Sequence, residues 1–459
     1  IIDSGRYDYE FVEKYTRGFE EFKTYLDTQA MEQLSKWCGI SVTDIEKLTD
    51  IFCSTTKIPL VAYTGLEYQL SAIQNNRAIF VLWAITGKLD APGAIYLNAK
   101  GLETPKLFEI PEEDKPIGVD EFPLFYKFSG LGQFSRFPKA VLEDEPYPVR
   151  GLMILGGSPV LSFPDSKSWR EAYKKLDCLI VLDRYYTEDA RYADVVFPAC
   201  SLFEVPKAVP GPEGPHIVEP LIAPVGESKN DVLIMGAIAE KLGFGDKLPQ
   251  TEEELRSWLL SGTAPYAGDF GAGAGQKKEK HYKKYETGEL RSDGKPGFPT
   301  PSGKLEICST ILEENGFVPY PEYKDIRSIS ELAGEEYPFT MTSGARSNNR
   351  MGVFGANLDK IAEIEPYPFV DINAEDAKEI GIEDGDMVKV ITPFANGTFK
   401  AKIRGIARHA IHIPHGGGSA YMAEPWKNGN VNDLCSLDYA DPMTGFVLIK
   451  SVPCRVEKV

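Results

Sequence analysis

A glycine-rich loop after a short apolar run is the part of this sequence best suited to binding a ligand. Residues 151–155 are apolar and lead into Gly156, Gly157 and Ser158, and a later apolar run ends at Asp183. In a doubly wound nucleotide site, such glycines let backbone N–H groups approach a phosphate, and the acid accepts hydrogen bonds from ribose hydroxyls. The alternative is a tight turn and a surface acid that bind nothing. We expect the ligand-binding arrangement.

Regular elements must hold this loop in place. The spacing of apolar residues predicts helices within 5–55, over 72–85 and over 231–242, and a strand over 59–63. The pattern from Thr251 to Glu254 is a capping box and predicts one more helix.

A different pattern begins near residue 370. Asn373 is suited to cap a short helix, and Asp384 with Gly385 is suited to a tight turn. Residues 387–392 and 398–403 alternate apolar and polar types around Asn396-Gly397, which predicts a hairpin with one buried face. The pattern alone indicates a small β barrel.

The composition excludes several functions. The net charge of −18 argues against a nucleic-acid partner, which requires a basic face to displace phosphate counterions. The basic tract 277–284 is short, and we expect a solvated loop there. No apolar run approaches the roughly 20 residues that cross a bilayer, so we expect no membrane span. The seven cysteines include no C-x-x-C pair, which argues against an iron–sulfur or structural zinc site in this chain.

Three longer stretches carry a family pattern. Residues 179–198 continue from the glycine loop, residues 371–390 lead into the hairpin, and residues 411–416 follow it. Together with 300–306, they resemble the molybdopterin oxidoreductases of the dimethyl sulfoxide reductase type. The resemblance implies an α/β fold followed by a β barrel.

The resemblance and the patterns together divide the chain. We expect the remainder of an α/β domain at 1–115, an irregular crossing segment at 116–150, a doubly wound Rossmann-like dinucleotide-binding unit at 151–265, a linker at 266–335 and a double-psi-type pterin-dinucleotide barrel at 336–459.

The implied cofactor is molybdopterin guanine dinucleotide with molybdenum or tungsten. The resemblance implies cofactor contacts from Gly156, Gly157, Ser158, Asp183, Thr187, Gly344, Arg346, His415, Gly416 and Asn432. Asp183 would meet the guanosine, and the forked guanidinium of Arg346 would meet a phosphate or a pterin carbonyl. The alternative for Arg346 is a surface ion pair. His415 lacks a second histidine or cysteine at metal spacing, so we do not expect it to bind the metal. The resemblance implies that the metal ligand lies outside this chain, and we identify no catalytic residue.

In relatives, a 4Fe-4S domain and the metal ligand precede the part that this sequence resembles. We therefore expect a missing N-terminal region or a separate subunit, and the chain alone to be inactive. The complete enzyme would perform two-electron oxygen-atom transfer or reduction of a small-molecule substrate, in the manner of thiosulfate or polysulfide reductases. A non-redox hydratase, a dehydroxylase and an inactive structural fragment are the alternatives. An electron-transfer iron–sulfur subunit is a possible partner, and cytoplasmic and exported locations both stay open.

Overall fold

The chain folds into two compact units, each described here by itself. The computed structural model describes residues 1–97, 115–209, 215–261, 280–324, 335–345, 347 and 358–459. Unit 1 draws on residues 1–67, 71–103 and 277–324, and unit 2 on residues 68–70, 104–276 and 325–459.

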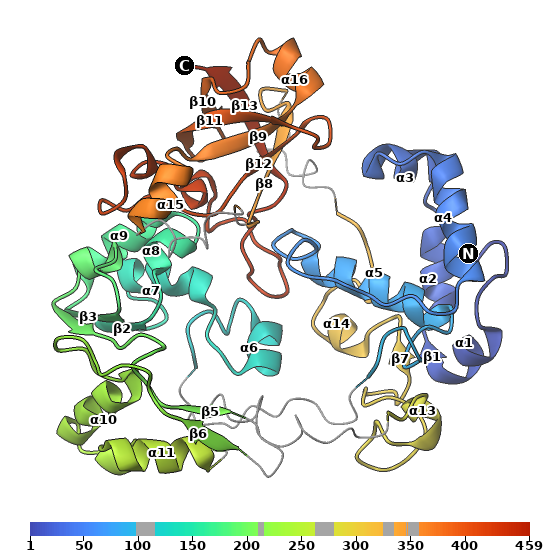
Figure 1. Cartoon of the computed structure of the whole chain (residues 1–459). Coiled ribbons are helices and arrows are strands. Elements are labelled where there is room, and N and C mark those ends of the chain that lie inside the picture. The colour runs from blue at the N-terminus through green and yellow to red at the C-terminus, as the bar shows by residue number, and fades with distance from the viewer. Residues whose placement is uncertain (98–114, 210–214, 262–279, 325–334, 346, 348–357) are drawn as a thin grey trace. The chain divides into compact units, whose positions relative to one another are not determined.

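Unit 1 is mainly helical, and Figure 1 shows it in blue and yellow. Two short strands, β1 (Thr16–Arg17) and β7 (Leu305–Glu306), pair in parallel. The helices predicted within 5–55 and over 72–85 are confirmed. The helices of unit 1 are α1 (Tyr9–Tyr15), α2 (Phe19–Leu26), α3 (Met31–Cys38), α4 (Val42–Ser54), α5 (Ala72–Ile85), α13 (Lys284–Thr287) and α14 (Thr310–Glu314).

The strand predicted over residues 59–63 is wrong. These residues form no regular element, and Val61 is 94% exposed. A strand needs a neighbour to satisfy its backbone groups, and no described strand pairs with this segment. The apolar pattern alone could not report the missing neighbour.

Residues 280–324 of the predicted linker are folded into unit 1. Tyr285 and Phe298 pack in a buried cluster with Phe11, and Lys284, expected in a solvated loop, is 2% exposed. The Lys284 ammonium lies 2.5 Å from a carboxylate oxygen of Asp90, which is fully buried. The opposite charge of Asp90 offsets the desolvation of the buried Lys284 ammonium. Asp90 lies 194 positions away in the sequence.

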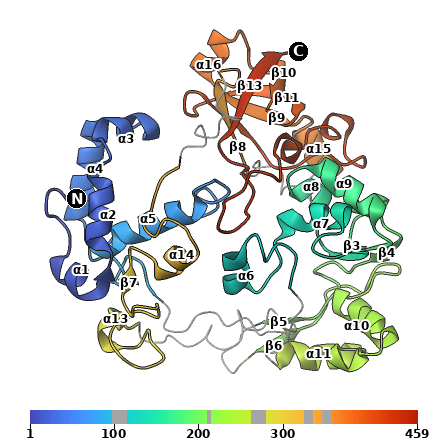
Figure 2. The same ribbon diagram turned by 180° about the vertical axis from the view of Figure 1, so that it is seen from behind.

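Unit 2 contains an α/β layer. Strands β2 (Gly151–Leu155), β3 (Cys178–Asp183) and β4 (Val195–Pro198) form a parallel sheet in that order. Helices α8 (Pro159–Ser162) and α9 (Ser166–Lys175) connect β2 to β3 (Figures 1 and 2). The predicted strand, loop, helix and strand over 151–183 are confirmed, and both strands end at the same edge of the sheet.

Residues 116–150, predicted to be irregular, contain two helices. These are α6 (Pro123–Ser129) and α7 (Phe137–Glu143). Each carries a proline at one of its first two positions, where the missing N–H has no helical partner to lose. Pro123 and Pro138 therefore lie at the starts of helices.

A hairpin and two longer helices follow the sheet. Strands β5 (Lys207–Val209) and β6 (His216–Val218) pair antiparallel. Helices α10 (Asp231–Lys241) and α11 (Glu252–Leu260) confirm the two predictions for this region, including the capping box between Thr251 and Glu254.

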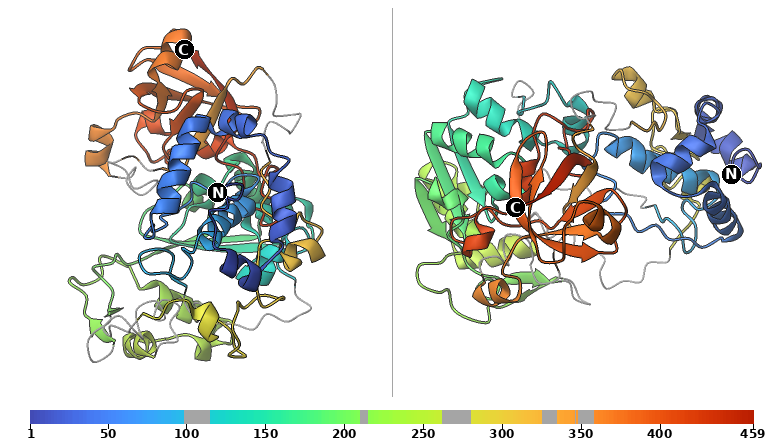
Figure 3. Two further views of the ribbon diagram at one scale, coloured as in Figure 1. Left: turned by 90° about the vertical axis from the view of Figure 1, so that its right-hand side faces the viewer. Right: turned by 90° about the horizontal axis from the view of Figure 1, so that it is seen from above.

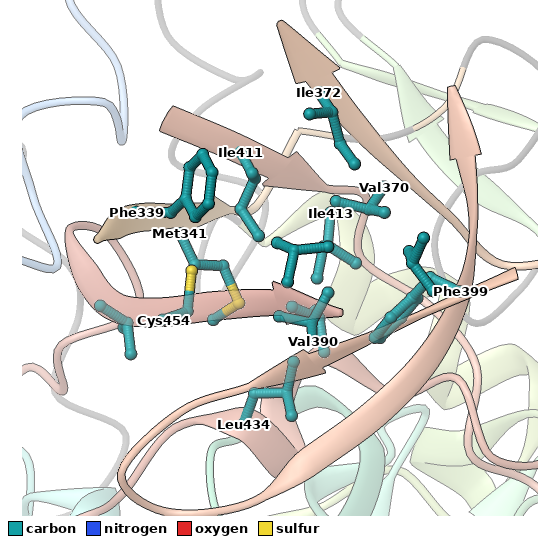
Figure 4. Close-up of a cluster of buried hydrophobic side chains, with 14 of the residues drawn as sticks. Phe339, Met341, Val370, Ile372, Val390, Phe399, Ile411, Ile413, Leu434 and Cys454 are labelled. Carbon is teal, nitrogen blue, oxygen red and sulfur yellow. The ribbon is translucent and has the colours of Figure 1, made fainter. Parts of the chain in front are cut away.

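The last part of unit 2 is a closed six-stranded barrel, drawn in orange to red in Figure 3. Its strand order is β10-β11-β9-β12-β8-β13, with parallel pairs β11–β9 and β12–β8. Residues such as Met341, Ile372, Val390 and Phe399 fill its interior (Figure 4). The predicted C-terminal barrel is confirmed. Its elements are β8 (Phe339–Ser343), α15 (Asp359–Ile364), β9 (Phe369–Asn373), α16 (Ala374–Glu379), β10 (Met387–Ile391), β11 (Asn396–Arg404), β12 (Ala410–Ile413) and β13 (Val452–Lys458).

The hairpin of the barrel turns earlier than its sequence suggests. Asn396 and Gly397 already lie in β11, where they pair with Ile391 and Val390. The turn is made by residues 392–395, and the Thr392 amide donates to the Ala395 carbonyl at 2.9 Å. The side chain of Thr392 also accepts hydrogen bonds inside the turn, a local contact that competes with the Asn-Gly signal.

The α/β layer and the segment after β12 share one core. Met422 and Trp426 are 4% and 2% exposed and belong to the cluster that contains Ile154 and Leu161. The chain beyond the barrel strand is thereby held against the loop after β2.

Candidate functional site

The loop after β2 presents open backbone. Gly156 has a φ of +58°, and its amide donates to the Leu182 carbonyl at 2.9 Å. No atom lies within 4 Å of the position that a Cβ of Gly156 would take. A phosphate can therefore approach this backbone without meeting a side chain.

Ser158 holds the loop in shape through Asp189. The Ser158 hydroxyl is buried and donates to Asp189, so it is used inside the protein. Asp189 also accepts hydrogen bonds from the Val160 amide at 3.1 Å and the Tyr173 hydroxyl at 2.7 Å. Burial raises the pKa of the Asp189 carboxyl, although these donors oppose the shift.

Sequence reasoning missed Asp189. It lies in the quoted family run 179–198 between Thr187 and Asp194, but nothing in its spacing marks it as buried. Thr187 accepts from the Ala190 amide at 3.2 Å and so caps the short turn that carries Asp189. These residues fix the loop indirectly.

Asp183 lies at the end of β3, on the edge that bears Gly156. One of its carboxylate oxygens accepts from the Tyr185 amide at 3.0 Å. Asp231, at the start of α10, lies near enough for the charge of Asp183 to add to the effect of burial, and both raise the pKa of Asp231. Oδ1 of Asp231 is buried and has no hydrogen-bond partner among the described residues. Asp231 is a second acceptor at this edge that the sequence did not reveal.

Glu188, which directly follows Thr187, is 3% exposed. It accepts from the Ala420 amide at 3.0 Å and from Arg191 at 2.8 Å. The carboxylate thereby ties the segment after β3 to the segment after β12.

His415 and Asn432, both predicted to contact the cofactor, lie side by side in the structure. His415 Nδ1 lies 3.5 Å from Asn432 Nδ2, and the same amide donates to the Leu161 carbonyl at 2.8 Å. Leu161 belongs to α8, directly after the glycine loop. The structure therefore places this pair beside the helix that follows the loop.

The glycines after His415 allow close packing. Gly416 has a φ of +137°, and a Cβ on Gly418 would lie 2.8 Å from the Cβ of Asn430. Asn430 in turn donates to the Ser166 hydroxyl at 3.0 Å. Glycine is required here by the approach of the barrel loop to the α/β layer.

Gly344 lies at the end of β8 with a φ of +104°, and the Lys450 ammonium donates to the carbonyl of the neighbouring Ser343. The predicted contact residue Arg346 lies outside the described residues. The other predicted contacts gather on the carboxyl edge of the sheet and on the barrel loops that pack beside it.

The donor set fits a nucleotide better than a metal ion. The loop backbone, which no neighbouring side chain covers at Gly156, suits a phosphate, and Asp183 with Asp231 suits hydroxyl or N–H donors. In the described ranges, no three His, Cys, Asp or Glu side chains gather as a metal site.

All seven cysteines are free thiols. None of the described helices has the length and apolar character needed to cross a bilayer.

Two family models match this chain. Residues 70–241 match the molybdopterin oxidoreductase family, and residues 340–453 match the molydopterin dinucleotide binding domain. The first match includes the glycine loop and Asp183, and the second includes the barrel with His415 and Asn432. The residues gathered in the structure thus come from both matched segments.

Known proteins agree with these matches. The chain is 28% identical to the probable oxidoreductase YoaE of Bacillus subtilis over 85% of this chain and 55% of that protein. It is also 28% identical to the F420-dependent formate dehydrogenase subunit alpha of Methanocaldococcus jannaschii, over 90% of this chain and 62% of that protein. The solved acetylene hydratase from Pelobacter acetylenicus has a similar fold, with a TM-score of 0.81 and 20% identity over 100% of this chain and 69% of that one.

The chain spans between 55% and 62% of the length of these two curated relatives. The α/β layer, the closed barrel and the two matched segments occur in the order that the sequence predicts. The chain belongs to the molybdopterin oxidoreductase family, and its barrel is the family's molybdopterin dinucleotide-binding domain.

Proposed function

We propose that unit 2 binds molybdopterin guanine dinucleotide at the carboxyl edge of the β2-β3-β4 sheet. The observation that carries the proposal is the open backbone at Gly156 beside the acceptors Asp183 and Asp231. A pyrophosphate would meet the amides of the loop, and the guanosine would donate hydrogen bonds to the carboxylates.

Each group of residues has a separate part in this proposal. Gly156 and Gly157 would accept the phosphates, and Asp183 would orient the nucleotide. Asn432 and His415, held beside α8, would face the pterin half. Ser158, Asp189 and Thr187 would keep the loop in its open shape. The bound cofactor would supply two-electron chemistry at a molybdenum or tungsten ion.

The complete protein would be an enzyme acting on a small-molecule substrate, by oxygen-atom transfer or reduction. Because one relative is named a formate dehydrogenase and the solved neighbour an acetylene hydratase, both redox and hydration reactions are candidates. We place the metal ligand and a 4Fe-4S cluster in polypeptide beyond the part matched here, and expect this chain alone to be inactive. An iron–sulfur subunit would be the electron-transfer partner.

Asp183→Asn tests the site. Asparagine keeps an oxygen for the Tyr185 amide but replaces a carboxylate oxygen with an N–H donor group. A lost hydrogen bond to a charged group is worth about 1.5–3 kcal/mol, so the variant should retain much less pterin dinucleotide. The measurement is pterin dinucleotide and guanosine monophosphate per chain, released from protein produced in cells that make the cofactor.

Asp194→Asn is the matched control. Asp194 accepts from the Leu179 amide at 2.7 Å, near the start of β3 and so at the opposite edge of the sheet. This variant should keep the cofactor content of the unaltered protein. Equal content in the two variants would contradict the proposed place of the nucleotide, and no pterin in the unaltered protein would contradict the function.

A further inference from the structure

We propose that Tyr186 and Tyr421 form an aromatic platform that stacks on the base of the bound nucleotide. The inference rests on the proposed function, because it names what recognises the base of that dinucleotide. Neither tyrosine belongs to the set that the sequence predicts.

The two rings meet at the surface of unit 2. Their centroids lie 5.3 Å apart with an interplanar angle of 89°, so the edge of one ring faces the other. Tyr186 is 56% exposed and Tyr421 is 50% exposed. Ring surface is therefore left for a third aromatic group, and edge-on and offset contacts are favoured between such groups.

The backbone on both sides of Tyr421 is fixed. The amide of Ala420 donates to buried Glu188, and Met422 is 4% exposed in the core of the α/β layer. The amide of Tyr421 itself donates to the Ser419 hydroxyl at 3.2 Å. Its ring is thus held at the surface by neighbours that are anchored inside.

Tyr186 is held in a similar way. The preceding amide, of Tyr185, donates to Asp183, and the following residue, Thr187, caps the turn at Ala190. Tyr186 lies three positions after Asp183, the proposed nucleotide acceptor at the end of β3. We therefore place the platform next to the proposed site, at the carboxyl edge of the sheet.

A planar base is the ligand that this pair fits. Aromatic side chains stack on nucleotide bases with little dependence on sequence because every base has a π face. Lone exposed aromatics are ordinary on protein surfaces. Here two are anchored against each other by separate chain segments, and Glu188 links those segments.

The test is calorimetric titration of the full chain with GDP and, separately, with pyrophosphate. Tyr186→Ala and Tyr421→Ala should each weaken GDP binding about tenfold, while pyrophosphate binding should not change. Tyr421→Phe and Tyr421→Trp should retain GDP affinity, because stacking needs the ring and not the hydroxyl. Melting temperatures should stay near that of the unaltered chain.

Tyr147→Ala is the matched control, since Tyr147 is 42% exposed elsewhere in unit 2. It should leave both titrations unchanged. Unchanged GDP affinity in the Tyr186→Ala, Tyr421→Ala double variant would overturn the platform but not the proposed function, which the Asp183 comparison tests. Equal weakening of GDP and pyrophosphate, or no GDP binding by the unaltered chain, would also overturn it.

Discussion

Acidic side chains near the sheet differ in whether the protein already satisfies them. Asp189 and Glu204 accept several hydrogen bonds within the protein, whereas Oδ1 of Asp231 accepts none from the described residues. The sequence identified Asp183 from its place after an apolar run. It could not separate the satisfied acids from the unsatisfied one, because that depends on donors brought in from other parts of the chain.

Glu204 makes a prediction about pH. Hydrogen bonds from Ser201, and from the Val225 amide, lower the pKa of the Glu204 carboxyl from 4.5 to about 2. A carboxyl whose pKa is lower in the folded state than in the unfolded state stabilises the fold at pH values above the unfolded-state pKa. This stabilisation is lost as the pH falls from about 4.5 toward about 2. Glu204→Gln should therefore lower the melting temperature at neutral pH, and the difference should shrink across that window.

The measurement is the melting temperature from pH 7 down to pH 2.5. Glu227→Gln, a change at an exposed residue in the loop before α10, is the control and should leave the profile unchanged. A constant difference between Glu204→Gln and the unaltered protein at every pH would contradict the assignment.

At the scale of elements, the loop between β2 and α8 depends on a buried acid contributed after β3. Strands β2 and β3 could be predicted because each is a nearly continuous run of apolar residues. The apolar pattern did not reveal α6 and α7, each with a proline at one of its first two positions, and the Asn396-Gly397 signal misplaced the barrel turn, which Thr392 fixes. The start of a helix and the position of a turn depend on single residues and their local side-chain contacts, which apolar periodicity does not reveal.

Asp189→Ala tests the element that holds the loop. The change leaves the Ser158 and Tyr173 hydroxyls and the Val160 amide without their acceptor, and should destabilise the layer by about 3 kcal/mol. Tyr173→Phe removes one donor only and should cost about 1 kcal/mol. The destabilisation in each variant is measured by hydrogen exchange of peptides from residues 151–198. Equal effects of the two changes would show that Asp189 is not the shared acceptor.

At the scale of the whole molecule, the sequence predicted the α/β layer and the barrel but not the partners of the segment between them. Residues 280–324 lack long apolar runs, yet Lys284 and Tyr285 are buried against residues near positions 11 and 90. Contacts over such separations are not visible in local patterns. The same holds for the shared core, in which Trp426 joins the α/β cluster.

The central claim is that a dinucleotide reaches the backbone of the loop after β2. Gly156→Ala tests it, with Gly381→Ala as the control. Both glycines have a positive φ, +58° and +67°, and neither has an atom within 4 Å of the added Cβ. Each change should therefore strain the backbone by about 1–2 kcal/mol without a clash.

The measurement is pterin dinucleotide per chain in the two variants. Gly156→Ala should lose most of the cofactor, because its methyl group stands where the phosphates approach, while Gly381→Ala should keep the content of the unaltered protein. Full cofactor content in Gly156→Ala, with stability matching that of Gly381→Ala, would contradict the account.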